Sequence, residues 1–485
     1  MRLAPRVAGW LAVGALFSAC TPLLLDLDRS GKGGGADGGP GRDSGVPDTG
    51  GADGADTGAP PVLPAATPQW SIVPADAAPT FGSALAGTAL WAFVGDPGAD
   101  NGDGLLGAFR PPTGGRTTLT LDDAAWRLRG DDRDALGCAV SLDGPAEWIA
   151  VAACAADTRG EEAEDAGEVH LLPVAELRVG DVPLADTTRT VLVGEYDGGA
   201  MGSAVAFGDL DGDGFSDLLA GAPGEDDSAG RVRLEPGPFF PGVIAGRDAP
   251  WSMRGDTSGA GLGTFLAAED LDGDGRDELI TCGPGESLGG RRVGVCVIVA
   301  GQADWSLDDG PAAALEALRF AGDADHALPT PRAAFSCPGP ARDCATAGGP
   351  RTWWVADPSA DEGRGALWWA PLSAPWPARL GPADGAGEAR GAGGLGAAIL
   401  AVDGDRVLAS APRDGPGGAL FLFDATATGA GPVRLADAPP GDLGLGLPLA
   451  AFSPVLIATG VARHPDATAG SPGVRIWSVN GLWGD

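Results

Sequence analysis

Positively charged side chains are scarce in this chain of 485 residues. Lysine and arginine together number 32, aspartate and glutamate 66, and the formal net charge at pH 7 is −34. Such a chain repels the phosphates of nucleic acids and of anionic lipid surfaces. The composition therefore excludes nucleic acid as a partner, and we expect contact with a membrane only through a lipid anchor.

Recognisable catalytic patterns are absent as well. The sequence contains no HExxH motif, and its three histidines, His170, His326 and His464, have no nucleophile pattern beside them. Carboxylate pairs for glycoside hydrolysis stay open, because a sequence does not report how far apart acidic residues lie. We expect a protein that is not an enzyme, with a carbohydrate-binding or carbohydrate-active envelope protein as the alternative.

The regular spacing of an amphipathic helix is also missing. Apolar residues occur in short runs separated by glycine, proline and aspartate, and the chain contains 82 glycines and 42 prolines. Short apolar runs of this kind are typical of half-buried strands joined by tight loops. The chain is predicted to be all-β.

The clearest motif lies between Met201 and Leu234. A Met-Gly pair, an apolar segment, a carboxylate-rich loop, a second apolar segment, a Gly-Ala-Pro turn and a third apolar segment follow one another. Acidic residues occupy positions 1, 3, 5 and 9 of the loop: Asp209, Asp211, Asp213 and Asp217. Convergent oxygen ligands of this kind suit Ca2+, and the carbonyl of Phe215 is a further candidate. An EF-hand has a glutamate at position 12, where this loop has Ala220.

The same loop recurs in the next repeat. Its acidic residues are Asp270, Asp272, Asp274 and Glu278. Arg276 takes the place of Phe215, and Thr281 stands at position 12. Two copies with the same departure from the EF-hand predict two calcium sites, although acidic glycine-rich loops also occur as solvated turns.

Three shorter acidic segments lack this spacing. They are Asp100–Asp103, Asp143-Gly144 and Asp403–Asp405. The last two are too short to surround an ion, and the first follows a Gly-Asp-Pro turn instead of joining the first two strands. We interpret all three as plain loops or turns, with a third metal site as the less favoured alternative for Asp100–Asp103.

At this point the residues carry a resemblance to a known family. Gly202, the DxDGDGxxD loop and the Gly221-Ala222-Pro223 turn resemble the FG-GAP repeat of integrin alpha-subunit β-propellers, which also occurs in bacterial surface proteins. In that family seven repeats form a closed ring of four-stranded blades. The resemblance implies a calcium-binding module for binding or adhesion.

The pair of a large apolar residue and glycine that opens the motif recurs along the chain. It is found at Phe81-Gly82, Leu136-Gly137, Met201-Gly202, Leu262-Gly263, Leu395-Gly396 and Leu443-Gly444, with a degenerate copy at Leu328-Pro329. The spacing predicts a seven-bladed β-propeller of four-stranded antiparallel blades. If the degenerate unit, residues 328–372, is not a blade, the number is six.

A further apolar segment precedes each opening pair and is predicted to be the fourth strand of a blade. These segments are Trp126–Leu128, Val191–Val193, Trp251–Met253, Leu318–Phe320, Ala378–Leu380 and Val433–Leu435. A seventh, Trp70–Ile72, stands before the first complete unit. We expect this N-terminal strand to complete the last blade, because closing the ring removes two open sheet edges.

The N-terminal region reads as an export signal followed by a tether. Residues 1–20 combine Arg2 and Arg6 with a short apolar stretch and end in a lipobox at Cys20, the expected lipidation site. An uncleaved anchor is the alternative, but the apolar stretch is shorter than a membrane span. Residues 21–64, rich in glycine, aspartate and proline, are predicted to be a disordered tether, and residues 65–485 the propeller. We expect a monomer that is exported and lipid-anchored to the bacterial outer membrane or cell surface.

The other six cysteines occur in neighbouring pairs: Cys138 and Cys154, Cys282 and Cys296, and Cys337 and Cys344. Disulfides are their expected state in an oxidising compartment. A zinc site is the less favoured alternative, because no CxxC pair is present.

The surface groups suggest where a partner binds. Acidic residues gather between the predicted second and third strands, at Asp157–Asp165 and Glu225–Asp227, on the face opposite the metal loops. We hypothesise an acidic recognition face for an unknown protein or glycan ligand. A structural envelope lipoprotein without a specific ligand is a further alternative.

Two other features have a plain structural interpretation. The tripeptides Arg129-Gly130-Asp131 and Arg254-Gly255-Asp256 occupy one repeat position, which favours a turn over an adhesive motif. Four tryptophans, Trp353, Trp354, Trp368 and Trp369, are expected to fill the space between blades, although tryptophan also stacks on sugars.

Overall fold

The computed structural model describes residues 68–478 with gaps. The gaps are residues 75–77, 79, 158–162, 178, 289, 306–308, 323–327, 329–330, 337–350, 373–374, 385–386, 392, 403–404, 416, 427–431, 438–448, 454–455 and 462–472. The predicted signal and tether, Cys20, and the Cys337 and Cys344 pair therefore lie outside the described residues.

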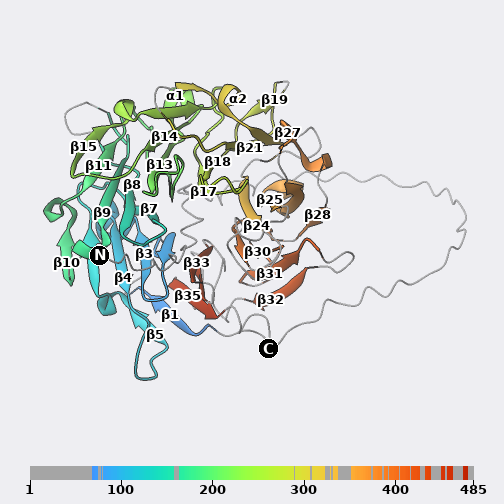
Figure 1. Ribbon diagram of the computed structural model, residues 1–485. Helices are drawn as coiled ribbons and strands as arrows, with labels where there is room; N and C mark the ends of the chain where they lie inside the picture. Colours follow the sequence, from blue (N-terminus) through green and yellow to red (C-terminus); the bar gives the residue numbers. More distant parts are fainter. Residues whose placement is uncertain are drawn as a thin grey trace, which may run out of the picture.

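Seven antiparallel sheets stand around a common centre as the blades of a propeller (Figure 1). From the inner to the outer edge, blade 1 contains β2 (Ala84–Gly87), β3 (Ala92–Asp96), β4 (Leu105–Phe109) and β6 (Trp126–Arg129). Blade 2 contains β7 (Leu136–Leu142), β8 (Trp148–Ala153), β9 (Glu168–Pro173) and β11 (Thr190–Val193). Blade 3 contains β12 (Ala204–Gly208), β13 (Asp217–Ala222), β14 (Arg231–Glu235) and β16 (Trp251–Arg254).

The remaining blades follow the same order. Blade 4 contains β17 (Phe265–Glu269), β18 (Glu278–Gly283), β21 (Val295–Val299) and β23 (Leu318–Ala321). Blade 5 contains β24 (Arg332–Ser336), β25 (Arg351–Asp357), β26 (Ala366–Leu372) and β28 (Gly387–Arg390). Blade 6 contains β29 (Ile399–Val402), β30 (Arg406–Ala411), β31 (Ala419–Asp424) and β32 (Val433–Asp437). Blade 7 contains β33 (Leu449–Ser453), β34 (Leu456–Val461), β35 (Gly473–Ser478) and β1 (Trp70–Val73).

Both the number of blades and the closure of the ring are confirmed. The degenerate fifth unit forms a complete blade. The N-terminal strand β1 runs antiparallel to β35, with Ser71 opposite Arg475, so the two ends of the chain share blade 7.

Five blades carry a fifth strand, which was not predicted for any blade. Each of these short strands comes from the chain segment of the next blade and lies parallel to the outer strand of the blade that it extends. The pairs are β5 (Thr118–Thr120) on β1, β10 (Gly180–Pro183) on β6, β15 (Gly242–Ala245) on β11, β22 (Asp309–Pro311) on β16 and β27 (Arg379–Leu380) on β23. The blades are therefore interlocked at their outer edges and not only packed side by side.

One predicted strand was assigned wrongly. The segment Ala378–Leu380 was expected to be the outer strand of blade 5, but its Arg379 and Leu380 form β27, and the outer strand is β28. The sequence of β28, Gly-Glu-Ala-Arg, has only one small apolar residue and therefore gave no strand signal. Its Gly387 lies against the ring of Trp369, where a Cβ would collide with the ring.

Helices are short and lie in the connections. They are η1 (Ala99–Gly102), η2 (Leu121–Asp123), η3 (Val174–Glu176), η4 (Leu184–Asp186), α1 (Glu225–Ser228), η5 (Gly246–Asp248), α2 (Ala312–Leu315), α4 (Ala360–Gly363) and η6 (Pro382–Asp384). A hairpin of β19 (Ser287–Leu288) and β20 (Arg291–Arg292) extends from blade 4. No helix in the described ranges is long and apolar enough to cross a membrane.

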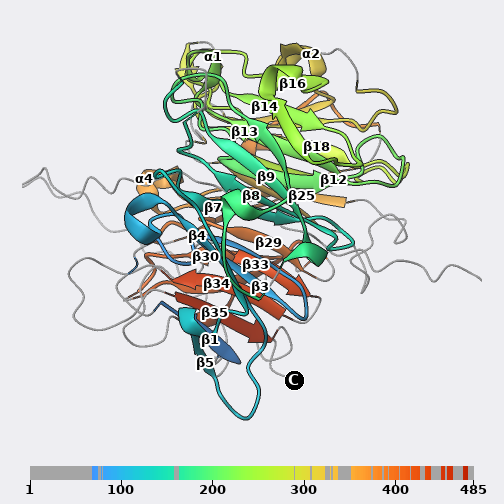
Figure 2. The ribbon, with the colours of Figure 1, turned by 90° about the vertical axis from the view of Figure 1, so that its left-hand side faces the viewer.

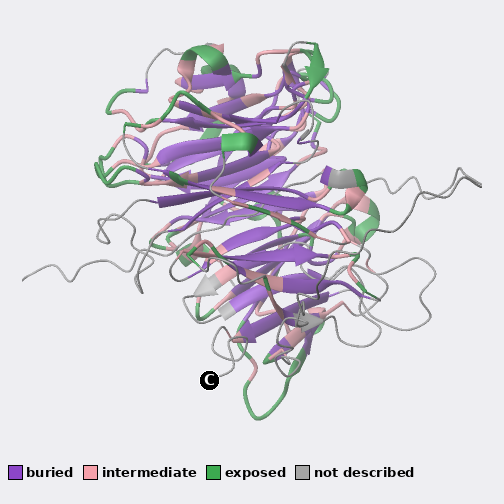
Figure 3. Ribbon diagram, turned by 90° about the vertical axis from the view of Figure 1, so that its right-hand side faces the viewer, coloured by how far each residue is buried: buried purple, intermediate pink, exposed green. Residues whose placement is uncertain are grey.

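The core lies between blades that pack face to face (Figures 2 and 3). Inner strands bury small side chains such as Ala84 and Ala204, whereas outer strands bury Trp126 and Trp251. This gradient suits a wedge that widens away from the ring centre. The space-filling role expected for the tryptophans holds for three of the four, because Trp353, Trp354 and Trp368 are buried.

Two of the three predicted disulfides are present. Cys138 on β7 is bonded to Cys154, and Cys282 on β18 to Cys296 on β21. Both link neighbouring strands within one blade, as the spacing predicted.

The glycine of the opening pair brings neighbouring blades into backbone contact. Gly137 has φ +85°, and a Cβ there would lie 2.5 Å from the carbonyl oxygen of Leu105 and 3.2 Å from Cα of Gly95 in blade 1. Both its conformation and its surroundings therefore require glycine.

We expect Gly137→Ala to lower the free energy of unfolding by about 3 kcal/mol or more, because it adds a steric collision to the cost of a positive φ. The matched control is Gly115→Ala, since Gly115 has φ +81° and nothing within 4 Å of a Cβ. That control should cost about 1 kcal/mol. Urea unfolding measures both, and equal losses would show that the backbone contact between blades contributes little.

Candidate functional site

The first metal loop joins β12 to β13 and is shaped by its own carboxylates. Asp209 accepts hydrogen bonds from the backbone N–H of Gly212 at 2.8 Å and of Gly214 at 3.0 Å. Asp211 accepts from the N–H of Asp213 at 3.0 Å, and Asp213 from that of Phe215 at 2.8 Å. These bonds fold the segment so that three carboxylates approach one another.

The second loop, between β17 and β18, repeats this pattern. Asp270 accepts from the N–H of Gly273 at 2.7 Å and of Gly275 at 3.2 Å. Asp272 accepts from Asp274 at 3.0 Å, and Asp274 from Arg276 at 2.8 Å. Two segments that lie in different blades thus adopt one conformation.

The carboxylates converge in both loops. Oxygens of Asp209, Asp211 and Asp213 lie within 4.8 Å of one another, and so do oxygens of Asp270, Asp272 and Glu278. Calcium binds oxygens at about 2.3 to 2.6 Å, so ligands on opposite sides of the ion are about 5 Å apart. The donor sets therefore fit calcium in charge, atom type and spacing.

The two donor sets differ at position 9. Asp217 accepts from the N–H of Leu210 at 2.8 Å and of Gly237 at 3.0 Å, and it does not join the first cluster. Glu278 is one methylene longer and reaches the second cluster. The ninth residue is therefore a stronger ligand candidate in the second loop than in the first.

The residue at position 7 explains a second difference. In the second loop Arg276 holds Asp274 through an ion pair of 2.9 Å, and Asp274 is not part of the cluster. The first loop has Phe215 there, whose side chain is exposed, and Asp213 stays in the cluster. That the carbonyls of Phe215 and Arg276 bind metal stays a prediction.

Burial and mutual repulsion shift the acidity of the ninth residues. Burial, with a smaller contribution from the neighbouring aspartates, raises the pKa of Asp217 to about 7 and that of Glu278 to about 8, although backbone hydrogen bonds act in the opposite direction. Among the described residues, Arg276 is the one basic side chain paired with a loop carboxylate. A divalent cation would supply the positive charge that these clusters lack.

The two loops also contact each other. Asp277 of the second loop accepts a hydrogen bond from the N–H of Asp209 at 2.8 Å. Nε of Arg276 donates to the carbonyl oxygen of Asp211 at 3.2 Å. This contact was not predicted from the sequence, because Asp277 stands outside the ligand positions of the repeat and Arg276 was considered only for its backbone carbonyl.

The opposite end of β13 corrects part of the predicted acidic face. Glu225 is completely buried and forms an ion pair with Arg233, with distances of 2.8 and 2.7 Å. Asp226 pairs with Arg231 at 2.8 Å. Both arginines lie on the adjacent strand β14, so these carboxylates are structural; Asp227 remains exposed.

The other acidic cluster is partly described. Asp157, Glu164 and Asp165 are exposed, whereas Glu161 and Glu162 lie outside the described residues. The acidic face therefore rests on this cluster and Asp227.

The two Arg-Gly-Asp segments lie at the ends of the outer strands β6 and β16, at the same position of the repeat, and are engaged within the fold. The N–H of Gly130 donates to the carbonyl of Gly104 at 3.0 Å, and that of Gly255 to Gly230 at 2.9 Å. A Cβ at either glycine would collide with a backbone carbonyl of the same blade. Asp256 is held by Arg319, which leaves it engaged within the fold.

The shorter acidic segments also behave as predicted where they are described. Asp100 pairs with Arg129, and Asp143 accepts hydrogen bonds from the backbone of Glu147 and Trp148 at 2.7 and 2.9 Å. Of Asp403–Asp405 only Asp405 is described.

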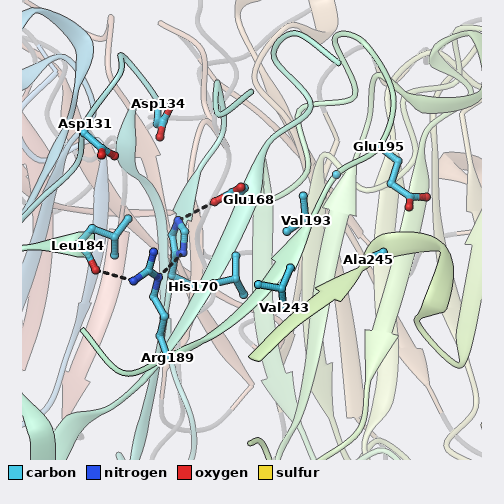
Figure 4. A pocket seen from close by; sticks show the side chains of 12 residues that line it. Asp131, Asp134, Glu168, His170, Leu184, Arg189, Val193, Glu195, Val243 and Ala245 are labelled. Atoms are coloured by element: carbon cyan, nitrogen blue, oxygen red, sulfur yellow. Dashed lines mark hydrogen bonds and ion pairs between the residues drawn. The ribbon is translucent and has the colours of Figure 1, made fainter. Parts of the chain in front are cut away.

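A pocket of about 340 Å³ opens beside β9, β11 and β15 (Figure 4). Nδ1 of the buried His170 accepts a hydrogen bond from Nε of Arg189 at 3.2 Å. The proton of the neutral ring therefore resides on Nε2, which faces Glu168 at 3.6 Å. Burial, and next the charge of Arg189, lower the pKa of His170 to about 3. Sequence reasoning missed this group, because its members come from separate strands and connections.

Comparison with known proteins identifies one repeat. The FG-GAP repeat family matches residues 201–234, which contain the first metal loop. No curated protein sequence is similar to the chain. Among solved structures, the WD40 domain of coronin from Toxoplasma gondii has 12% identity and a TM-score of 0.46, over 87% of this chain and 88% of that chain. A chain of the Mitotic Checkpoint Complex has 12% identity and a TM-score of 0.42, over 88% and 97%.

His170 gives the protein a specific sensitivity to acid. The unfolded chain takes up a proton at this histidine near pH 6.5, whereas the folded chain does so only near pH 3. Stability present above pH 6.5 is therefore lost as the pH falls, by about 1.4 kcal/mol per unit. We expect His170→Gln to reduce the slope of unfolding free energy between pH 6 and pH 5 by about this amount in urea titrations. Identical slopes would contradict a neutral, buried His170.

Proposed function

We propose that this chain is a calcium-binding β-propeller that serves as a non-enzymatic binding or adhesion module at the bacterial cell surface, attached through a lipid on Cys20. The FG-GAP repeat and the propeller fold suggest a binding module of this kind. Two disulfides agree with an oxidising, extracytoplasmic compartment.

The observation that carries calcium binding is the convergence of three carboxylates in each of two loops. Because the loops contact each other, we expect ions in both to stiffen the hairpins of blades 3 and 4 together. The ligands proposed are Asp209, Asp211, Asp213, Asp217 and the Phe215 carbonyl in the first loop, and Asp270, Asp272, Asp274, Glu278 and the Arg276 carbonyl in the second.

One argument for the sugar-binding alternative, the presence of tryptophans that could stack on sugars, is weakened by their burial. Three tryptophans that could have stacked on sugars are buried between blades, with Trp353 packed edge-on against Phe320 at 5.5 Å between ring centres. We therefore place the recognition surface on the exposed acidic loops at the end opposite the metal loops, where a basic protein surface or a cationic glycan would be attracted.

Calcium should stabilise the folded chain. A ligand present at about 100 times its dissociation constant adds about 2.7 kcal/mol per site. We expect Asp211→Asn and Asp272→Asn each to remove one site in calorimetric titration with calcium and to lower the gain in melting temperature. The control is Asp103→Asn, in the acidic segment whose aspartate bonds the N–H of Arg133 at 3.1 Å instead of joining a cluster. If Asp211→Asn and Asp103→Asn reduced the calcium-dependent gain in melting temperature equally, the assignment of Asp211 as a calcium ligand would be refuted.

The proposed recognition face is tested by removing negative charges from it and measuring the binding of a partner. Immobilised residues 28–485 are exposed to cell-envelope material in calcium, and bound material is identified and titrated. Replacing Glu161, Glu162 and Glu164 by glutamine should weaken binding about tenfold while leaving the melting temperature unchanged. The control neutralises three exposed carboxylates at the metal-loop end, Asp122, Asp186 and Asp248. Equal affinities for both variants would place the partner elsewhere.

A further inference from the structure

The residues between the ligand side chains distinguish the two metal loops. Positions 7 and 8 are Phe215 and Ser216 in the first loop, and Arg276 and Asp277 in the second. Phe215 is an exposed apolar side chain, whereas Arg276 brings a positive charge into a group of carboxylates. A positive charge beside a cation site opposes the binding of a cation.

Arg276 engages one of the proposed ligands of its own loop. Its Nη1 lies 2.9 Å from Oδ2 of Asp274, the residue at position 5. Oδ1 of the same carboxylate accepts the backbone N–H of Arg276 at 2.8 Å. Both oxygens of Asp274 are therefore in contact with Arg276. The cluster of three carboxylates in this loop forms without Asp274.

The first loop has the same backbone arrangement without the arginine. Oδ1 of Asp213, also at position 5, accepts the backbone N–H of Phe215 at 2.8 Å. In the described ranges no basic side chain pairs with Asp213, and its carboxylate joins the cluster of that loop. The two loops thus compare one conformation with and without an arginine at position 7.

Arg276 is held in place by the neighbouring loop and strand connection. Ion pairs between mobile, exposed side chains contribute little. Here Nε of Arg276 donates to the carbonyl oxygen of Asp211 in the first loop at 3.2 Å. Its side chain also passes two glycines, since a Cβ at Gly301 would lie 2.6 Å from its Cβ and one at Gly212 3.1 Å from its Cγ. The fold therefore presents the guanidinium to Asp274 in a fixed position.

The acidic residue next to Arg276 does not offset its charge within the second loop. Asp277 directs its carboxylate to the first loop, where Oδ2 accepts the N–H of Asp209 at 2.8 Å. The N–H of Asp277 in turn donates to the carbonyl oxygen of Asp209 at 2.8 Å. The second loop keeps the positive charge of this pair of residues, while the negative charge faces the first loop.

We infer that Arg276 acts as a tethered cation of the second loop, which competes with calcium for Asp274 and lowers the calcium affinity of that site. The inference rests on the proposed calcium binding and names a residue that controls it. The affinity of such loops depends on the number and charge of their oxygen ligands. Because Asp274 becomes available only when the ion pair opens, the second site fills at a higher calcium concentration than its four carboxylates alone would require.

Calorimetric titration of residues 21–485 with calcium tests the competition one site at a time. In the Asp211→Asn background only the second site remains, and adding Arg276→Gln should tighten calcium binding about tenfold. In the Asp272→Asn background only the first site remains, and Arg276→Gln should change its affinity about twofold or less, because Arg276 contacts only a backbone carbonyl there. The matched control is Arg291→Gln, which removes an exposed arginine of β20 and should leave both affinities unchanged.

A further background separates competition for Asp274 from general charge repulsion. In a chain with Asp211→Asn and Asp274→Asn, the arginine has no carboxylate at position 5 to hold, and the new amide still offers an oxygen ligand. Arg276→Gln should then change the affinity of the second site about twofold or less.

Two results would overturn the inference while leaving calcium binding intact. The first is an unchanged second-site affinity when Arg276→Gln is added to Asp211→Asn. The second is an equally large gain with and without Asp274→Asn, since Arg276 would then act through its charge alone. A wild-type chain that binds no calcium would instead refute the proposed function, and the inference with it.

Discussion

Close packing between blades is the constraint on which the rest of this structure depends. A single four-stranded sheet cannot bury both faces, so each blade acquires a core only from its neighbours. At the centre the backbones of adjacent blades touch through glycines such as Gly137 and Gly95, and toward the rim the widening gap is filled by Trp126 and Trp251. The opening pair of apolar residue and glycine is thus a packing device, and its recurrence along the sequence follows from the repetition of the same contact.

A chain with so many carboxylates must place them where their charge is tolerated. The structure does this in three ways. Glu225 is buried against Arg233, Asp143 accepts backbone hydrogen bonds in a turn, and Asp209 belongs to a cluster of like charges without a basic partner. The first two arrangements are satisfied by the protein itself. The third has no such partner within the protein, and under our proposal a cation would satisfy it, so that similar acidic segments in the sequence would differ in what they can bind.

Features that depend on a local sequence pattern were predicted from the sequence, whereas contacts between residues on separate strands were missed. The metal loops, the blades and two disulfides follow from spacing within about twenty residues. The pairing of Glu225 with Arg233 was missed, because acidic residues in a loop read as exposed when the facing strand is not considered. The strand β28 was missed for another reason: its Gly387 and Ala389 are only half-buried, and Glu388 and Arg390 are exposed, so this strand needs few apolar residues. The pocket at His170 combines separate elements and has no signature in any one of them.

The two ends of the ring differ in a way that the topology fixes. Each metal loop joins an inner strand to the second strand, and the exposed acidic loops follow the second strand, so they lie at opposite ends of strands such as β13. A short parallel strand starts at the same end as the outer strand it covers, which is the metal-loop end. The outer strand β1 starts at that end too, so the described chain enters the ring on the side of the metal loops.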